Sequence, residues 1–339
     1  FMKKLLFCIF LLVIIVIFVN SEEKGRIGQS EVTKWKDDAN GCFLLMFDDS
    51  WPSHVQVAVP ELEKRQLTAT FYINPAKGEY KKMKDFWEGE KAAWKKGVIY
   101  GNHTMTHDGI QGMEDAIWEI EECNKVIINT IPGKKNRLIS WGKPGVKDWK
   151  ISEEDTQKIL KKNYLIERPP FRDHGIVYHL KNTDEILALA DKAIKNNSME
   201  YVIAHGVERY PEINWGYQDF WPWKLQSFID VLDGLVLRRE KNKLWITDHI
   251  SYYKYVTERD KAKINIIDTS NKQIEIKILL DLDKDLYDMP LTIKTIVPDN
   301  WFKCMIFQNT NKQTVDKKDG KIIYNVFPET STIKIIPIQ

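Results

Sequence analysis

The chain has 339 residues, of which 43% are hydrophobic and 29% are charged, a composition typical of a soluble globular protein. Its 50 Lys and Arg residues nearly balance its 48 Asp and Glu residues, so the net charge is only +2. Because no long basic stripe runs along the sequence, we expect no nucleic-acid partner.

The first residues have the pattern of a secretory signal peptide. Two lysines precede an unbroken apolar run from Leu5 to Val19, and the short residues Asn20 and Ser21 follow it. This order of charge, apolar run and cleavage-type residues is typical of a removed signal. We therefore predict a signal peptide over residues 1–21 and a protein that is secreted, periplasmic or at the cell surface. The alternative is a retained segment, which would be the protein's only contact with a membrane.

Seven short apolar runs alternate with helical patterns in the next part of the chain, and we predict each run to be a strand. They are Cys42–Phe47, Thr70–Ile73, Val98–Tyr100, Leu138–Trp141, Tyr164–Ile166, Tyr201–Ala204 and Leu244–Ile246. Helical spacing of apolar residues or a capping signal predicts helices over 112–131, from Ser152 onward, and over 183–196 and 223–237. Short apolar strands separated by helices predict an α/β fold with a parallel sheet, and about seven units favour a barrel over an open sheet. We assign residues 30–262 to this unit.

The pattern changes after Lys263, where apolar and polar residues alternate. The predicted strands are 263–267, 273–280, 291–297, 321–327 and 331–337. Alternation of this kind is typical of antiparallel sheets with one buried face. We predict that residues 263–339 form a small C-terminal antiparallel β domain, a β-sandwich-like accessory unit docked on the barrel.

Polar residues follow several of the predicted barrel strands. Asp48 and Asp49 come directly after the first strand, His103 and His107 follow the third, and His205 ends the sixth. In a closed parallel barrel, the C-terminal ends of all strands face one rim, where active sites lie. We therefore expect these five side chains to meet, although they are far apart in the sequence.

Two histidines four residues apart can bind one metal ion from one face of a helical turn. His103 and His107 have this spacing, and Asp49 would add a carboxylate. Two imidazoles and one carboxylate, with open positions left over, form a catalytic rather than a structural metal site. The alternative is that each histidine is an ordinary core or surface residue.

The neighbouring residue Asp48 could act as a base. Adjacent residues that leave a strand point in different directions, so one carboxylate can bind the metal while the other takes a proton from water. The alternative is structural: Asp49 or Ser50, before Trp51 and Pro52, could cap the start of a helix.

Three segments resemble motifs of the polysaccharide deacetylase family, also called the NodB-homology family or carbohydrate esterase family 4. They are Phe47-Asp48-Asp49-Ser50, Gly101-Asn102-His103-Thr104-Met105-Thr106-His107 and Ala204-His205-Gly206. The resemblance covers about residues 35–260 and includes the order and spacing of the strands. It implies a distorted (β/α)7-type barrel and an enzyme that removes acetyl groups from sugars.

The resemblance also implies roles for these residues. Asp48 would be the general base, and His205 would be the general acid that protonates the leaving amine or alcohol. Asp49, His103 and His107 would hold a divalent metal, most often Zn²⁺, with Co²⁺ or another divalent ion as alternatives. The expected partner is an acetylated glycan substrate, whereas the sequence leaves the glycan, the choice of N- or O-deacetylation and the oligomeric state open.

The sequence departs from the family at the fourth strand, where an Arg usually steadies the base. Trp141, Lys143 and Pro144 stand there instead, and we treat them as candidates for substrate binding or for orienting the base. Arg168, in an Arg-Pro-Pro-Phe segment one strand later, could supply the missing Arg or could pair with a neighbouring acid. Asp173 is our suggestion for the residue that tunes His205.

An aromatic-rich segment follows His205, and its residues Trp215 and Trp221 are candidates for stacking on sugar rings. The alternative is that these side chains pack the loop against the barrel, and we expect only one or two to be exposed.

Two other functions fit part of this pattern. The absent Arg at the fourth strand and the added β module would suit a catalytically weakened carbohydrate-binding protein on the same barrel. The metal ligands would also suit a metal-dependent phosphoesterase, although the sequence shows no second metal cluster.

Overall fold

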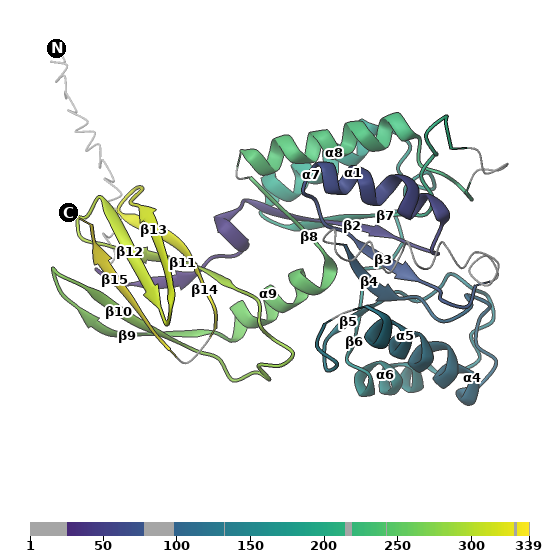
Figure 1. Ribbon diagram of the computed structural model, residues 1–339, viewed down its shortest axis with the longest axis horizontal. Helices are drawn as coiled ribbons and strands as arrows, with labels where there is room; N and C mark the ends of the chain where they lie inside the picture. The colour runs from purple at the N-terminus through teal and green to yellow at the C-terminus, as the bar shows by residue number, and fades with distance from the viewer. Residues whose placement is uncertain are drawn as a thin grey trace, which may run out of the picture.

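The computed structural model describes residues 26–77, 98–131, 133–213, 219–241, 243–328 and 331–338. The predicted signal peptide and Trp215 lie outside these residues. Figure 1 shows an α/β unit and a β unit side by side, with helix α9 (His249–Lys261) between them. Within the described parts of the chain, no helix has the length and apolar character needed to cross a membrane.

A curved parallel sheet of seven strands forms the α/β unit, in the order β6-β5-β4-β3-β2-β7 with β8 also paired to β2. The strands are β2 (Gly41–Phe47), β3 (Thr70–Ile73), β4 (Ile99–Asn102), β5 (Ile139–Trp141), β6 (Leu165–Glu167), β7 (Met199–Ala204) and β8 (Leu244–Thr247). All seven predicted strands are therefore present. Gly175, in the loop after β6, bridges to Ile203 of β7, so the sheet curls round with this loop between its two edges. This arrangement is the predicted distorted barrel.

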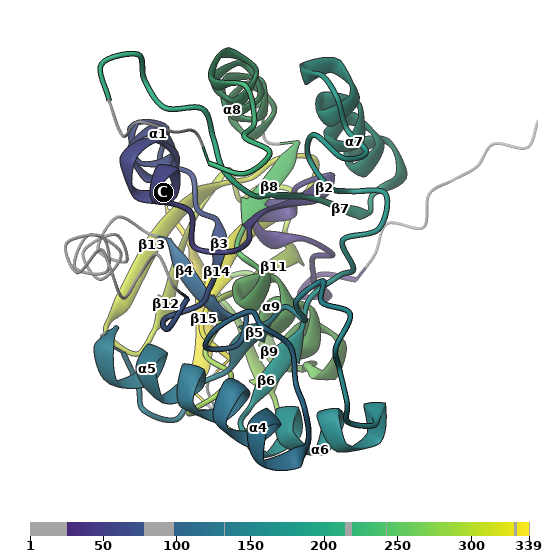
Figure 2. The ribbon, with the colours of Figure 1, turned by 90° about the vertical axis from the view of Figure 1, so that its right-hand side faces the viewer.

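Helices surround the curved sheet on its outside (Figure 2). They are η2 (His54–Ala58), α1 (Val59–Lys64), α4 (Met113–Ile117), η4 (Trp118–Glu122), α5 (Cys123–Thr130), α6 (Glu153–Lys162), α7 (Thr183–Asn196) and α8 (Leu225–Glu240). Helix α9 instead lies between the two units, and a short 3₁₀ turn, η1, covers Lys36–Asp38. Ser152 caps α6 as the sequence predicts, and Asn182 and Asp248 cap α7 and α9 in the same way. All seven residues of β2 are buried, as expected for a central strand of a sheet whose two faces are both covered.

Two antiparallel sheets pack face to face in the β unit, with the orders β1-β11-β14 and β13-β12-β15-β10-β9. The strands are β1 (Ser30–Val32), β9 (Lys263–Thr269), β10 (Ile274–Leu279), β11 (Leu291–Ile296), β12 (Lys303–Gln308), β13 (Asn311–Asp316), β14 (Lys321–Val326) and β15 (Thr332–Pro337). The predicted C-terminal antiparallel β domain is thus present, and inward residues of both sheets share one core.

Three strands of the β unit were not predicted. β13 is a polar edge strand with no buried residue, so it has no alternating signal to read. In β12 the four central residues are all apolar, which hides the alternation. β1 comes from the other end of the chain and pairs with β11, so residues 30–32 lie in the β unit rather than in the barrel sheet. The domain boundaries themselves stay a prediction.

Helix α9 connects the two units through its side chains as well as its backbone. Tyr255 of α9 is fully buried in the core of the β unit. Its hydroxyl donates a hydrogen bond to the backbone oxygen of Thr33 at 3.0 Å, and its ring lies 5.1 Å from that of Trp245 on β8. The last helix of the barrel therefore packs against the accessory unit.

Candidate active site

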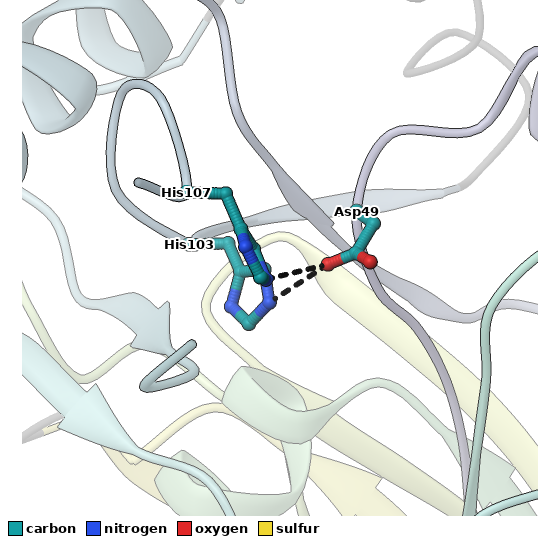
Figure 3. A group of neighbouring side chains, drawn as sticks. All are labelled: Asp49, His103 and His107. Atoms are coloured by element: carbon teal, nitrogen blue, oxygen red, sulfur yellow. Dashed lines mark ion pairs between the residues drawn. The ribbon is translucent and has the colours of Figure 1, made fainter. Parts of the chain in front are cut away.

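Three predicted metal ligands meet at the C-terminal ends of β2 and β4. Asp49 Oδ1 lies 3.2 Å from His103 Nε2 and 3.1 Å from His107 Nε2 (Figure 3). One ligand atom from each residue lies within 4.8 Å of the other two, close enough for all three to bind one ion. Strand register places them together, because β3 lies between β2 and β4 and all three strands run in parallel.

The backbone around these ligands is unusual. Asp49, Thr104 and His107 have positive φ angles of 73°, 69° and 70°, a region that residues other than glycine seldom occupy. Backbone strain of this kind costs about 1–3 kcal/mol per residue and gathers at functional sites. The surrounding hydrogen bonds hold it in place: Thr104 N–H donates to Asn102 Oδ1 at 3.0 Å, and His107 N–H donates to Thr104 Oγ1 at 3.2 Å.

Our prediction that His103 and His107 lie on a helical turn was wrong. The segment after β4 is a bend, and helix α4 begins only at Met113. The two left-handed residues reverse the chain so that both rings face Asp49. The structural alternative for Asp49 and Ser50 is not observed either, since the helix after Pro52 has no side-chain cap and the Ser50 hydroxyl accepts from Asn74 N–H at 2.8 Å.

The hydrogen bonds of this cluster fit a bound cation. His103 Nδ1 lies 2.5 Å from the backbone oxygen of Gly142, which can only accept, so Nδ1 carries the proton and the neutral ring offers a lone pair at Nε2. That lone pair faces Asp49 Oδ1, a buried atom that has no hydrogen-bond donor among the described residues. Two acceptors at this distance repel each other unless a positive charge lies between them. A divalent ion that accepts nitrogen and oxygen ligands, such as Zn²⁺, meets this need.

Asp49 is ionised in this setting. Burial alone would raise the pKa of its carboxyl group, but contacts with His103 and His107 hold the pKa well below its usual range. Without a metal, a protonated imidazole ring can supply the compensating charge. Asp49 is therefore a carboxylate in either state, as a metal ligand must be.

Arg168 forms a buried ion pair with Asp48. Its Nη2 donates to Asp48 Oδ2 at 2.7 Å, and both side chains are almost fully buried. The guanidinium group, which comes from the end of β6, lies 4.5 Å above the ring of Tyr72. Asp48 Oδ1 is buried and has no donor among the described residues, so one oxygen is held while the other is free to accept a proton.

His205 faces the same cluster from the end of β7. Its Nε2 lies 3.8 Å from Asp49 Oδ2, and its ring contacts Phe171 and Tyr178, with centroids 5.5 and 5.4 Å away. Burial lowers the pKa of His205, and the nearby carboxylates of Asp48 and Asp49 oppose this shift. The structure does not bring Asp173 to this ring, because the Asp173 side chain is exposed to solvent, and His205 Nδ1 has no hydrogen-bond partner among the described residues.

The sequence model of the polysaccharide deacetylase family matches residues 36–171, a range that includes Asp48, Asp49, both metal-site histidines and Arg168. Residues 36–171 belong to the polysaccharide deacetylase family. His205 and the β unit lie beyond the matched range.

Several known proteins are similar to this chain. A gellan lyase of Bacillus sp. is 21% identical over 348 residues, which cover 91% of this chain but only 13% of the lyase. The chain thus spans about one-eighth of that relative's length. A family 4 carbohydrate esterase of Streptomyces lividans, solved with acetate, is 17% identical over 61% of this chain and 92% of its own, with a TM-score of 0.40. A family 4 pseudoenzyme from Bacillus anthracis is 13% identical over 62% of this chain and 64% of its own, with a TM-score of 0.39.

The candidate residues at the fourth strand of the barrel do not contact the candidate base, Asp48. Trp141, a candidate for substrate binding or for orienting the base, has no exposed surface and packs in the barrel core, so its side chain is not accessible to a substrate. The ammonium group of Lys143 is exposed, 3.9 Å from Glu153 and above the ring of Trp149. Pro144 is buried. Of the four candidates Trp141, Lys143, Pro144 and Arg168, Arg168 is therefore the one that contacts Asp48.

Of the two candidate tryptophans, Trp221 is 45% exposed and stacks on Tyr178 with centroids 4.9 Å apart. Phe220 beside it is 54% exposed, whereas Trp223 is buried in the core. The expectation of one or two exposed aromatic residues in this segment agrees with these described positions. Trp215 lies outside them.

The role of Gly142 was missed in the sequence and yields a testable prediction. A Cβ atom on Gly142 would lie 2.7 Å from Arg168 Nε and 2.8 Å from the ring of Tyr72, both of which are buried. Gly142→Ala should displace Arg168 from Asp48 and lower kcat by about tenfold or more, since misplacing a catalytic group by about 1 Å is that costly. The control is Gly145→Ala, because no heavy atom lies within 4 Å of a Cβ atom at that position. This variant should leave acetate release unchanged. Equal rates for both variants would contradict the role of Gly142.

Proposed function

We propose that this protein is a divalent-metal-dependent hydrolase that removes acetyl groups from a polysaccharide or oligosaccharide, by N- or O-deacetylation. The observation that carries the proposal is the convergence of Asp49, His103 and His107, with Asp48 and His205 beside them. A bound divalent ion would supply Lewis-acid chemistry, because it would polarise the acetyl carbonyl and make water a better nucleophile.

The residues of the chain would then move the protons. Asp48 Oδ1, held ready by the Arg168 contact to Oδ2, would accept a proton from the attacking water. The oxygen of that water adds to the carbonyl carbon, and the bond from this carbon to the sugar nitrogen or oxygen breaks. His205, in its protonated imidazolium form, would give a proton to the leaving atom, so that the products are acetate and a free amine or hydroxyl group.

Asp48→Asn should remove the base while it preserves the size of the side chain. General-base catalysis contributes about 10²–10⁴-fold, so kcat for acetate release should fall by that factor. Metal content, measured by elemental analysis, should stay the same because Asp48 is not a ligand. Wild-type kcat in this variant would contradict the role of Asp48.

The experiment that tests the function itself is acetate release from a panel of acetylated glycans. The panel would contain chitin oligosaccharides, peptidoglycan and acetylated plant polysaccharide, each assayed with chelator and with added zinc or cobalt. The proposal expects release from at least one substrate, lost with chelator and restored by metal. Release of phosphate from phosphate esters, with no acetate from any glycan, would favour a phosphoesterase instead.

The alternative of a catalytically weakened binding protein rested on the Arg missing from the fourth strand and on the added β module. Arg168 fills that place from the next strand, 2.7 Å from Asp48. Among the described residues, Asp49, His103 and His107 form the one group of three or more potential ligands close enough to share an ion, so a site for two metal ions has no support there. We also propose that the protein is exported, on the strength of the N-terminal pattern in the sequence.

A further inference from the structure

Lys77 is a charged residue at the metal cluster for which the proposed reaction has no use. It follows β3, and its side chain is 18% exposed. Its Nζ donates to the backbone oxygen of Asp49 at 3.2 Å and lies 3.9 Å from Asp49 Oδ2. Asp49 is the one carboxylate within 4.0 Å of this ammonium group among the described residues.

The position of the ammonium group is fixed by an aromatic ring. Lys77 Nζ lies 4.5 Å from the ring centroid of Trp51, which in turn stacks on Phe220 with centroids 6.2 Å apart. A lysine held on a tryptophan face next to a reaction centre presents its charge in one place, unlike a free surface lysine.

When a metal binds, the positive charge of Lys77 is no longer balanced by Asp49 and becomes available to a substrate. Asp49 then binds the ion. A divalent cation with one carboxylate ligand has a net charge of about +1, and the ammonium group of Lys77 adds to it. Asp48 and Arg168 compensate each other. The buried Glu119 directs its carboxylate at Thr106, which donates to it from both N–H and hydroxyl groups. The loaded site would therefore be positive on the side of Lys77.

Aromatic rings continue from Lys77 round to the acid. Phe220 lies against Trp221 with centroids 5.8 Å apart, Trp221 stacks on Tyr178, and Tyr178 lies next to His205. Exposed rings of this kind suit the apolar faces of sugars. Lys77 Nζ and His205 Nε2 lie 3.9 and 3.8 Å from the same atom, Asp49 Oδ2, so one sugar bound at these rings would lie within reach of both side chains.

We propose that Lys77 binds a carboxylate of the substrate, so that the glycan is an acidic one, with a carboxylate on or next to the acetylated sugar. This inference rests on the proposed function, since it assigns a substrate class to the same site. A salt bridge from Lys77 to the glycan would add to binding without taking part in the proton transfers.

Binding can be tested without turnover. Zinc-loaded protein would be titrated calorimetrically with oligogalacturonate, in which every sugar carries a carboxylate, and with its neutral methyl ester. The wild type should bind the acid about tenfold more tightly than the ester, the size expected for one hydrogen bond to a charged group. Higher salt should reduce this difference.

Three variants complete the test. Lys77→Gln should abolish the preference for the acid, and Lys77→Arg should keep part of it. Lys312→Gln is the matched control, because Lys312 also lies over an aromatic ring, that of Phe307, but in the β unit; this variant should behave as the wild type. Zinc affinity of Lys77→Gln, measured by competition with a chelator, should not change, which separates substrate binding from support of Asp49.

Equal binding of acid and ester, no binding of either, or undiminished acid binding in Lys77→Gln would each overturn the inference; the last would mean that the carboxylate goes to the metal instead. A failure of this inference can be told apart from a failure of the proposed function. Lys77-dependent binding without acetate release from any glycan would sink the deacetylase proposal alone, whereas acetate release without acid preference would sink only the role of Lys77.

Discussion

His103→Ala should abolish metal binding and acetate release together. The His103 ring is 2% exposed, is oriented by the Gly142 oxygen and supplies one of three protein ligands. Loss of one ligand from a three-ligand site removes the Lewis acid, which is worth several kcal/mol in the transition state, so kcat/KM should fall by about 10³-fold or more. The measurement is acetate release beside zinc content after dialysis.

The control for this variant is His174→Ala. His174 is a partly buried histidine whose ring stacks on Tyr201 and lies 3.4 Å from Glu200, so it resembles His103 in packing but is not in the metal cluster. It should keep both zinc and activity. Full activity in a zinc-free His103→Ala protein that is folded by circular dichroism would refute the metal-dependent mechanism.

Arg168→Leu should destabilise the protein and inactivate it at the same time. The variant leaves the Asp48 carboxylate buried without its partner, and breaking a buried ion pair in this way costs about 3–5 kcal/mol of unfolding free energy. The base would also lose its fixed orientation, so kcat should fall by about 10²-fold or more. Urea unfolding and acetate release measure the two effects.

A double-mutant cycle separates the pair from general damage. Arg168→Leu combined with Asp48→Asn should cost less stability than the sum of the two single changes, because the neutral amide no longer needs a cation. Arg238→Leu is the matched control: Arg238 makes two contacts to Asp191 at 2.6 and 2.8 Å, but at the surface. It should cost no more than about 1 kcal/mol. Additive losses in the cycle would show that Arg168 and Asp48 are not coupled.

The barrel and the metal cluster could be predicted from sequence because both depend on regular features. Apolar runs of strand length give the sheet, and polar residues at strand ends give the rim on which Asp49, His103 and His107 meet. The parallel arrangement of β2, β3 and β4 brings these three residues together, because it places the C-terminal ends of the strands at one edge of the sheet.

Other parts of the site depend on local conformation that residue types do not encode. Four-residue spacing suggested a helical turn for the histidines, but the left-handed residues Thr104 and His107 give a bend instead. The conformation of a residue in that region depends on tertiary hydrogen bonds, here from Asn102 and Thr104. Pattern alone could not reveal it.

Which residue pairs with the proposed base, Asp48, depends on how side chains from neighbouring strands are arranged. Trp141 and Arg168 both end strands that neighbour each other, β5 and β6, yet the tryptophan turns into the core while the guanidinium crosses the barrel to Asp48. Gly142 makes this crossing possible, because a side chain there would occupy the space of Arg168. The sequence contained the glycine and the arginine, but only the three-dimensional arrangement joins them.

The central claim is that Asp49, His103 and His107 hold one divalent ion. Crystals grown with zinc, with diffraction measured on both sides of the zinc absorption edge, test it most directly. Our account predicts a single strong anomalous peak about 2.0–2.2 Å from an Asp49 carboxylate oxygen and from both Nε2 atoms. A fully occupied zinc site elsewhere, with no peak among these three side chains, would contradict it.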